Sequence, residues 1–225
     1  QRQMCIRDRS TAQPEAGPIV PCTVRIRRPW CGVLSYYRRM STLSDQLSSL
    51  PSFPKNLPIL DPATVPQDPE QLFQEWFQDA IASGNRQPHA MTFTTIQHGD
   101  TPVGRTLIVK DIDERGFHFS THRTSRKGEQ LEKNPRASMV FFWRESGRQV
   151  RVTGNVVALS GEESERDWEK RPSYTGEPNP EWQLYSLEPT EYEFMQARED
   201  RNHTRVEYVR ESSGWENHLV TTPAG

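Results

Sequence analysis

Residues 90–110, which read AMTFTTIQ HGDTP VGRTLIVK, decide the fold class of this chain. The segments 90–97 and 104–110 have the two-residue period of a β-strand, in which successive side chains point to opposite faces. Residues 98–102 between them have the composition of a tight loop. The stretch therefore predicts a β-hairpin.

Further strand-like segments follow this hairpin. Residues 138–143 and 149–158 flank the turn sequence Glu145-Ser146-Gly147 and predict a second hairpin. The other expected strands lie at 117–121, 191–196, 204–209 and 215–219.

Three segments with capping signals predict helices outside the strands. The first spans 68–84 and begins with Asp68 and Pro69, the second runs from Ser125 to about 134, and the third runs from 160 to about 171. Ser160 and Glu163 form a capping box for the third helix. This order of elements predicts a mainly β fold, an antiparallel β-barrel with flanking helices.

The charge of the chain is divided unevenly at Met40. The 225 residues hold 28 Lys and Arg against 30 Asp and Glu, but residues 1–39 contain eight Arg and two acids. All three cysteines, Cys5, Cys22 and Cys31, also precede Met40. The rest of the chain therefore offers no thiol nucleophile and no cysteine ligand for zinc, and a disulfide scaffold is excluded.

Residues 1–39 are expected to lie outside the folded domain. A basic, acid-poor start is compatible with a transit peptide or a nucleic-acid-binding arm, but four prolines interrupt it. Residues 3–9 (QMCIRDR) instead resemble a translated sequencing adapter, so we interpret 1–39 as a non-native or disordered leader. Residues 40–67 hold five prolines and predict an extended proline-rich arm, which leaves 68–225 as the domain.

Basic residues concentrate between Arg105 and Arg151, where 11 bases face six acids, although residues 40–225 together have a net charge of −8. This local excess predicts an anionic ligand. Arg126 and Lys127 directly follow Ser125, in the first helical turn, where the helix dipole disfavours cations. A phosphate at the helix N-terminus would explain both bases, and a solvated surface with a chance cluster of charges is the alternative.

Five short motifs occur in the order found in the pyridoxamine 5′-phosphate oxidase family, which this chain resembles over about residues 68–220. They are RTLIVK at 105–110, FSTH at 119–122, SRKG at 125–128, NPRA at 134–137 and RQVRVTG at 148–154; EFMQ at 193–196 and RNHTR at 201–205 continue the likeness. The resemblance implies a split barrel that binds flavin mononucleotide (FMN), usually as a homodimer with FMN at the interface. It also implies an oxidase that transfers a hydride from pyridoxine or pyridoxamine 5′-phosphate to FMN, which dioxygen then reoxidises.

Carried over by position, the resemblance assigns the cofactor contacts to Arg105, Thr106, Leu107, Ile108, Val109, Lys110, Ser120, Thr121, Arg126, Lys127, Gln149 and Arg205. It assigns the substrate contacts to Lys110, Arg171, Thr175, Arg201 and His203, with Arg201 and His203 as the catalytic pair and no metal. Arg201 and His203 are two positions apart on an expected strand, so their side chains share one face. A satisfied surface histidine is the alternative for His203.

Several residues depart from the family pattern. Asp167 stands where the family has a phosphate-binding Tyr, Met195 replaces the usual Trp, and the segment after Pro172 is shorter than in the vitamin-B6 enzymes. An acid beside a substrate phosphate would repel it, and parts of the sequence resemble the phenazine-biosynthesis branch. The alternatives are therefore an FMN-dependent oxidase of a dihydrophenazine-like substrate, or a non-catalytic flavin-binding module.

Phe141, Phe142 and Trp143 are consecutive on an expected strand, so at least one of them points away from the core. The aromatic helix stripe at 73–77 covers only one side of a small barrel, and a two-fold partner would cover the other. We therefore expect a homodimer with a small-molecule substrate, phosphorylated or not. No run of about 18 apolar residues occurs, and we expect a cytoplasmic protein with neither membrane nor nucleic-acid partners.

Overall fold

The computed structural model describes residues 42–221, so the predicted leader at 1–39 lies outside the described residues. The chain divides into two units, one that ends at Leu50 and one that begins at Pro51. In the first unit, α1 (Leu43–Ser48) is capped by Thr42, and none of its residues is buried. The extended conformation predicted for 40–67 is therefore wrong at α1, where a capping box and the absence of proline allow a helix.

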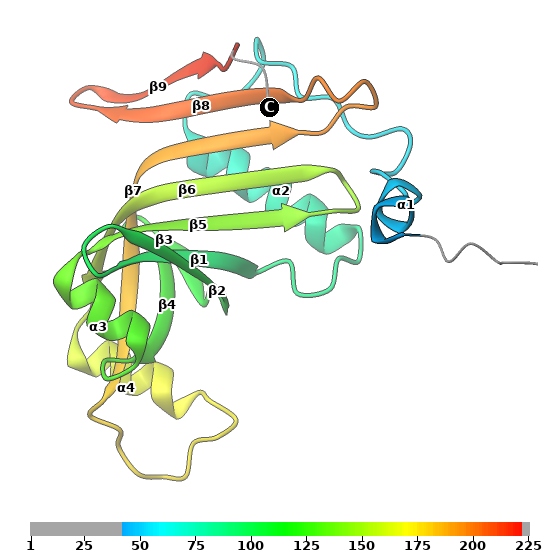
Figure 1. The fold of residues 1–225 in the computed structure, drawn as a ribbon. Coiled ribbons are helices and arrows are strands. Elements are labelled where there is room, and N and C mark those ends of the chain that lie inside the picture. Colours follow the sequence, from blue (N-terminus) through cyan, green and yellow to red (C-terminus); the bar gives the residue numbers. More distant parts are fainter. Residues whose placement is uncertain (1–41, 222–225) are drawn as a thin grey trace, which may run out of the picture. The chain divides into compact units, whose positions relative to one another are not determined.

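The second unit is built on one antiparallel sheet of nine strands (Figure 1). The strands are β1 (Ala90–Gln97), β2 (Thr101–Ile108), β3 (Asp111–Asp113), β4 (Gly116–His122), β5 (Arg136–Trp143), β6 (Arg148–Ala158), β7 (Trp182–Gln196), β8 (Thr204–Glu211) and β9 (Gly214–Leu219). Their order is β2-β1-β5-β6-β7-β4-β3, with β8 paired to β7 and β9 paired to β8. Both predicted hairpins, β1–β2 and β5–β6, are confirmed.

Strand β2 begins and ends earlier than predicted. It starts at Thr101, and Pro102 already pairs with Ile96 of β1. The prediction placed Thr101 and Pro102 in the loop. Because β2 lies at the edge of the sheet, the missing N–H of a proline leaves no ladder hydrogen bond broken. The strand can therefore include a residue that sequence patterns assign to a turn.

Strand β7 is the longest and organises the sheet. It pairs with β6 from Tyr185 to Gln196, while its other edge pairs with β4 at 182–187 and with β8 at 191–196. The register with β6 shifts between Thr153 and Gly154, at the level where the second edge changes partner. A Cβ on Gly154 would lie 2.0 Å from the carbonyl oxygen of Glu188, so only glycine fits this crossing.

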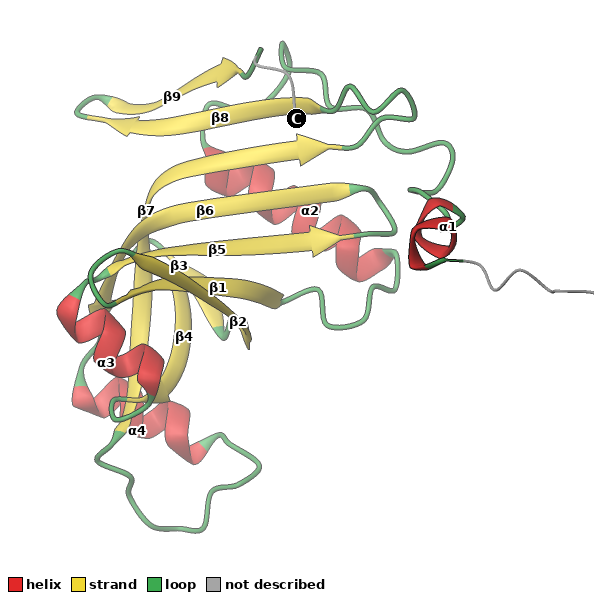
Figure 2. Ribbon diagram, in the orientation of Figure 1, coloured by secondary structure: helices red, strands yellow, loops and turns green. Residues whose placement is uncertain are grey.

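Three helices pack against the sheet, as Figure 2 shows: α2 (Pro69–Ala82), α3 (Arg126–Lys133) and α4 (Gly161–Glu169). They begin after Asp68, Ser125 and Ser160, the predicted caps. Helix α2 covers one face of the sheet, where the ring of Phe73 lies 5.0 Å from that of Phe141. Helix α3 packs against β1 and β4, and α4 packs against β7. The predicted mainly β, antiparallel fold with flanking helices is confirmed.

The consecutive aromatic residues of β5 divide between the two faces as predicted. Phe141 and Trp143 are buried in the core under α2, whereas the Phe142 side chain is 46% exposed on the opposite face. Among the described residues, no helix is long and apolar enough to cross a membrane.

Candidate functional site

A cluster of polar side chains joins the edge strand β2 to the start of α3. We call it the Arg105 cluster; its members are Arg105, Thr121, Ser125, Lys127 and Gln130. The Arg105 guanidinium donates to Oγ1 of Thr95 at 2.6 Å and to Oε1 of Gln130 at 2.9 Å. These two bonds direct the guanidinium away from the sheet edge and towards α3.

The start of α3 is shaped by its cap. The Ser125 hydroxyl accepts from the Gly128 N–H at 3.2 Å and lies 3.1 Å from the Thr121 hydroxyl. A Cβ on Gly128 would lie 2.2 Å from the carbonyl oxygen of Arg123, so this turn must contain glycine. Hydroxyl groups and the positive end of a helix dipole therefore meet beside Arg105.

The two cations of the cluster, Arg105 and Lys127, have no acidic partner among residues 42–221. Burial, followed by the nearby charge of Arg105, lowers the pKa of the Lys127 ammonium, and burial lowers the pKa of the Arg105 guanidinium. In the part of the chain that the structure describes, neither residue forms an ion pair. Two half-buried cations that repel each other make an environment that an anion would stabilise.

The residues predicted to share the phosphate are only partly brought together. Arg126 is exposed and lines a different hollow with Lys133 and Gln130, whereas Lys127 lies beside Arg105. Ser120 and Thr121 are neighbours on β4, so their side chains point to opposite faces. The Ser120 hydroxyl is buried without a hydrogen-bond partner among the described residues. Thr106 and Ile108 likewise point away from the face that carries Arg105 and Leu107.

A second group, which we call the Asp167 group, lies where β2 leads into β3 and where α4 ends. Its members are Lys110, Asp167, Arg171 and Trp182. Lys110 Nζ lies 3.4 Å from Oδ1 of Asp167, and the Trp182 indole N–H donates to Oδ2 at 2.8 Å. The Arg171 guanidinium lies 4.3 Å from the centre of the Trp182 ring. Thr175, the remaining predicted substrate contact near this group, is exposed in the loop that follows.

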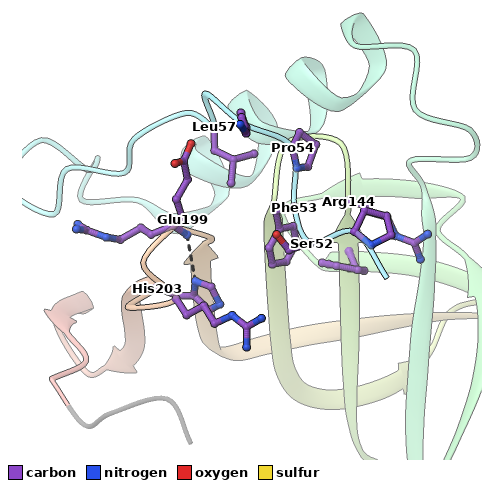
Figure 3. A pocket seen from close by; sticks show the side chains of 12 residues that line it. Ser52, Phe53, Pro54, Leu57, Arg144, Glu199 and His203 are labelled. Carbon is purple, nitrogen blue, oxygen red and sulfur yellow. Dashed lines mark hydrogen bonds between the residues drawn. The ribbon is translucent and has the colours of Figure 1, made fainter. Parts of the chain in front are cut away.

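The third group surrounds a pocket of about 640 Å³, which we call the His203 pocket (Figure 3). Arg201, His203, Arg144 and Phe142 line it together with residues 51–55 and Leu57. The His203 ring accepts through Nδ1 from the backbone N–H of Arg198 at 3.1 Å, which fixes the ring and leaves Nε2 without a hydrogen-bond partner among the described residues. Arg201, which has a positive φ of 61°, and His203 both precede β8, which begins at Thr204, so the prediction that they share one face of a strand is wrong.

Residues 51–57 were not expected to contribute to a site. The Phe53 ring packs edge-on against both Phe142 and His203, with ring centres 6.1 and 6.0 Å apart. The only sequence signal was a phenylalanine between two prolines in an otherwise polar segment. Because its partners lie about 90 and 150 residues further along the chain, no local pattern could reveal these contacts.

Gln149 and Arg205 lie on the same face as this pocket. Gln149 of β6 pairs with Phe142 of β5 and with Met195 of β7, and Met195 pairs with Arg205 of β8. A row of four side chains on one face therefore runs across β5, β6, β7 and β8: Phe142, Gln149, Met195 and Arg205. Nε of Arg205 is buried without a hydrogen-bond partner among the described residues, which leaves a donor for a ligand.

The predicted site residues thus fall into two sets at opposite ends of β7. Thr121 pairs with Gln183 near the start of β7, and Arg205 pairs with Met195 near its end. From Gln183 to Met195 the strand advances twelve residues, or roughly 40 Å along its length at about 3.3 Å per residue. One copy of the chain therefore presents two half-sites, one with the Arg105 cluster and the Asp167 group, the other with the His203 pocket and Arg205.

Comparisons with known proteins give matches to the parts of the chain that carry the two half-sites. A family model described as pyridoxamine 5′-phosphate oxidase matches residues 77–196, and one described as the pyridoxine 5′-phosphate oxidase C-terminal dimerisation region matches 182–221. A pyridoxine/pyridoxamine 5′-phosphate oxidase of Paraburkholderia phytofirmans is 34% identical over 207 residues, which cover 76% of this chain and 97% of that protein. Its counterpart from a Cyanothece species is 35% identical over 191 residues, 70% of this chain and 90% of the relative.

Two solved structures share the fold. PhzG from Burkholderia lata, in complex with tetrahydrophenazine-1-carboxylic acid, is 28% identical with a TM-score of 0.68 and covers 73% of this chain and 98% of its own. A pyridoxamine 5′-phosphate oxidase-related, FMN-binding protein from Nostoc punctiforme is 17% identical with a TM-score of 0.57, covers 66% of this chain and 96% of its own, and so supports the fold alone. The predicted split-barrel fold is confirmed.

Proposed function

Because the chain belongs to the pyridoxamine 5′-phosphate oxidase family, we propose that it is a cytoplasmic FMN-dependent oxidase of a small molecule. The observation that carries this proposal is the pair of half-buried cations, Arg105 and Lys127, which have no carboxylate partner in the described part of the chain. An FMN phosphate there would receive charge-assisted bonds from both cations. It would also meet the N–H groups at the start of α3.

The other residues near Arg105 and Lys127 also suit a phosphate. Thr121 and Ser125 add hydroxyl donors, and Ser120 can contribute its backbone N–H, since its side chain points to the other face. Arg126 is exposed and free to turn towards the same phosphate. The remaining FMN contacts proposed from β2 lie between Arg105 and Lys110.

We propose that a second copy of the chain completes the site. The half-site with Gln149 and Arg205 lies at the other end of β7, twelve residues along the strand, so we infer that one mononucleotide does not bridge both half-sites of a single copy. A two-fold axis places the Arg105 cluster of one copy beside the Arg205 half-site of the other, and it creates two equal sites. The match of 182–221 to a dimerisation region supports this arrangement.

The flavin ring would then lie between the two copies, with the His203 pocket next to it. Arg201 and His203 are proposed to hold and orient the substrate, because both line this pocket and the Nε2 atom of His203 is unused. Bound FMN would supply the redox chemistry, as an acceptor of a hydride from a substrate carbon that dioxygen reoxidises. The chain contributes the positioning and exclusion of water, with Phe53 and Phe142 as apolar walls.

Purification and anaerobic mixing test this function. We expect the chain from Met40 onward to bind FMN one per copy, and the flavin to lose its absorbance when the right substrate is added without oxygen. The names of the similar proteins suggest pyridoxine 5′-phosphate, pyridoxamine 5′-phosphate and a hydrogenated phenazine carboxylic acid as candidates. A chain that stays colourless with FMN refutes the proposal, and bound FMN that none of these reduces favours a non-catalytic module.

A further inference from the structure

We propose that Asp167 makes the Lys110–Arg171 end of the site select a substrate group with one negative charge, such as a carboxylate, over a phosphate dianion. The inference rests on the proposed function, because it concerns the substrate contacts of that same site. Its basis is the ion pair between Lys110 and Asp167 and the charge that this pair leaves behind.

The Asp167 carboxylate is fixed at this position. Its side chain is only 11% exposed, one oxygen lies 3.4 Å from Lys110 Nζ, and the other accepts from the Trp182 indole at 2.8 Å. Rotation away from Lys110 would leave the indole N–H and a buried carboxylate oxygen unsatisfied. The negative charge is therefore a permanent part of this end of the site.

Lys110 is the cation that Asp167 neutralises. With a side chain only 28% exposed and a carboxylate at ion-pair distance, its ammonium offers a second anion much less than a free lysine would. Of the two cations at this end of the site, Lys110 is therefore neutralised in an ion pair with Asp167, and Arg171 is left.

Arg171 is the cation that remains. Its guanidinium stacks on the Trp182 ring at 4.3 Å, its Nε lies 3.4 Å from the Ser173 hydroxyl, and it has no carboxylate partner among the described residues. A stacked guanidinium keeps its edge available for the two parallel hydrogen bonds that a carboxylate accepts.

The sum of charges favours a monoanion. Lys110, Arg171 and Asp167 together carry one positive charge, whereas a phosphate monoester carries about −1.5 to −2 at pH 7. The Coulomb energy is proportional to the charge, so a dianion doubles the repulsion from Asp167 and the attraction to both cations alike. The difference lies in the charge left over, because a bound dianion leaves about one negative charge uncompensated in this partly buried site and a monoanion leaves none. The free guanidinium balances a single negative charge completely.

A matched pair of probes tests the inference on the FMN-loaded protein. 4-Deoxypyridoxine and its 5′-phosphate differ only in the phosphate, and neither carries the 4′ group that is oxidised, so dissociation constants can be measured by calorimetry without turnover. Phenazine-1-carboxylate serves as the monoanionic probe. In the unaltered chain we expect the phosphate to tighten binding of deoxypyridoxine by less than about tenfold, and phenazine-1-carboxylate to bind at least as tightly as the phosphate probe.

Asp167→Asn removes the charge and keeps an oxygen that can accept from Trp182. This variant should raise the phosphate-to-deoxypyridoxine affinity ratio by about ten- to a hundredfold, because Lys110 is released and a repulsion is lost. Glu177→Gln is the control, since Glu177 is an exposed acid of the following loop whose side chain forms no ion pair in the described structure. Adding Lys110→Met to Asp167→Asn should abolish most of the gain.

The outcomes separate this inference from the proposed function. A chain that binds no FMN overturns the proposed function and the inference with it. A chain that binds FMN, but prefers the phosphorylated probe by more than about a hundredfold, overturns the inference alone. An unchanged affinity ratio in Asp167→Asn, or an equal rise in Glu177→Gln, also overturns it.

Discussion

Substitution of Lys127 by methionine tests the Arg105 cluster most directly, because it removes one charge and keeps the length of the side chain. If Lys127 contacts the FMN phosphate, the variant loses a charge-assisted hydrogen bond worth about 1.5–3 kcal/mol. That loss corresponds to a roughly 10- to 150-fold weaker affinity for FMN. A fluorescence titration of FMN with the protein measures it directly.

The same variant should behave differently without FMN. Lys127 is half-buried beside Arg105 in the first turn of α3, where a positive charge is unfavourable by about 0.3–1 kcal/mol. Its removal should therefore leave the free energy of unfolding of the FMN-free protein unchanged or slightly higher. The increase in Tm that FMN produces in the unaltered chain should shrink in the variant.

The contribution of Lys127 to the stability of the FMN-free protein should change with pH in a defined direction. The pKa of Lys127 is lowered in the folded protein by burial and by Arg105, so the unfolded chain binds more protons in the range between that lowered value and about 10.4. The FMN-free protein should gain stability from this group as the pH rises through that range. The difference in unfolding free energy between Lys127→Met and the unaltered chain should shrink accordingly.

Lys133→Met is the matched control. Lys133 lies in the last turn of the same helix, where the dipole favours a cation, and it lines the hollow that Arg126 also lines. It should leave FMN affinity within about twofold and lower the stability slightly. Equal losses of FMN affinity in the two variants would show that the cluster is general surface charge, and the phosphate assignment would be wrong.

Three further predictions concern assembly and stability. The chain should have a light-scattering mass of twice 26.0 kDa, and a monomeric mass with FMN bound would contradict the dimer. Mixed dimers of Lys127→Met with Arg205→Met should regain one intact FMN site at concentrations where neither parent variant binds FMN. Arg148→Met should lower the free energy of unfolding by about 1–3 kcal/mol, because buried Arg148 stacks on Trp76 at 4.5 Å and bonds Gln196 and Asp79. Removal of the exposed Arg198–Asp200 pair should have a smaller effect, because solvent screens it. Equal effects of the two changes in urea unfolding would refute the distinction. Gly154→Ala should cost about 1–3 kcal/mol or more through the contact with Glu188, whereas Gly161→Ala, with no atom within 4 Å of its added Cβ, should be neutral or stabilising in the same assay.

The parts of the fold that the sequence predicts well are those fixed by neighbouring residues. The caps Asp68, Ser125 and Ser160 satisfy N–H groups within three positions, so α2, α3 and α4 begin where expected. Strands β1, β5 and β6 have one buried face and one more open face, which produces the alternation that a sequence displays. For these elements, local chemistry and the tertiary environment agree.

The first half of β7 was missed for a physical reason. Residues 182–187 are buried on both faces, so the alternation that marks a half-exposed strand is absent, and the prediction began the strand at Glu191. The switch of its edge from β4 to β8 depends on the bulge opposite Gly154, a contact across more than 30 residues. Because β7 sets the separation of the two half-sites, the sequence could name site residues but could not show that they lie at opposite ends.

Pairing, rather than local composition, determines which basic residues are available to a ligand. The stretch from Arg105 to Arg151 contains 11 bases, but folding gives carboxylate partners to four of them: Lys110, Arg115, Arg148 and Arg151. Arg105 and Lys127 become half-buried beside each other with no ion pair to a described acid, and burial lowers the pKa of both. A charge count predicts an anion in this region. The fold places Arg105 and Lys127 at the start of α3, where we propose that the anion binds. It also pairs Lys110 with Asp167, which removes one cation from the place where the family resemblance predicts a second phosphate.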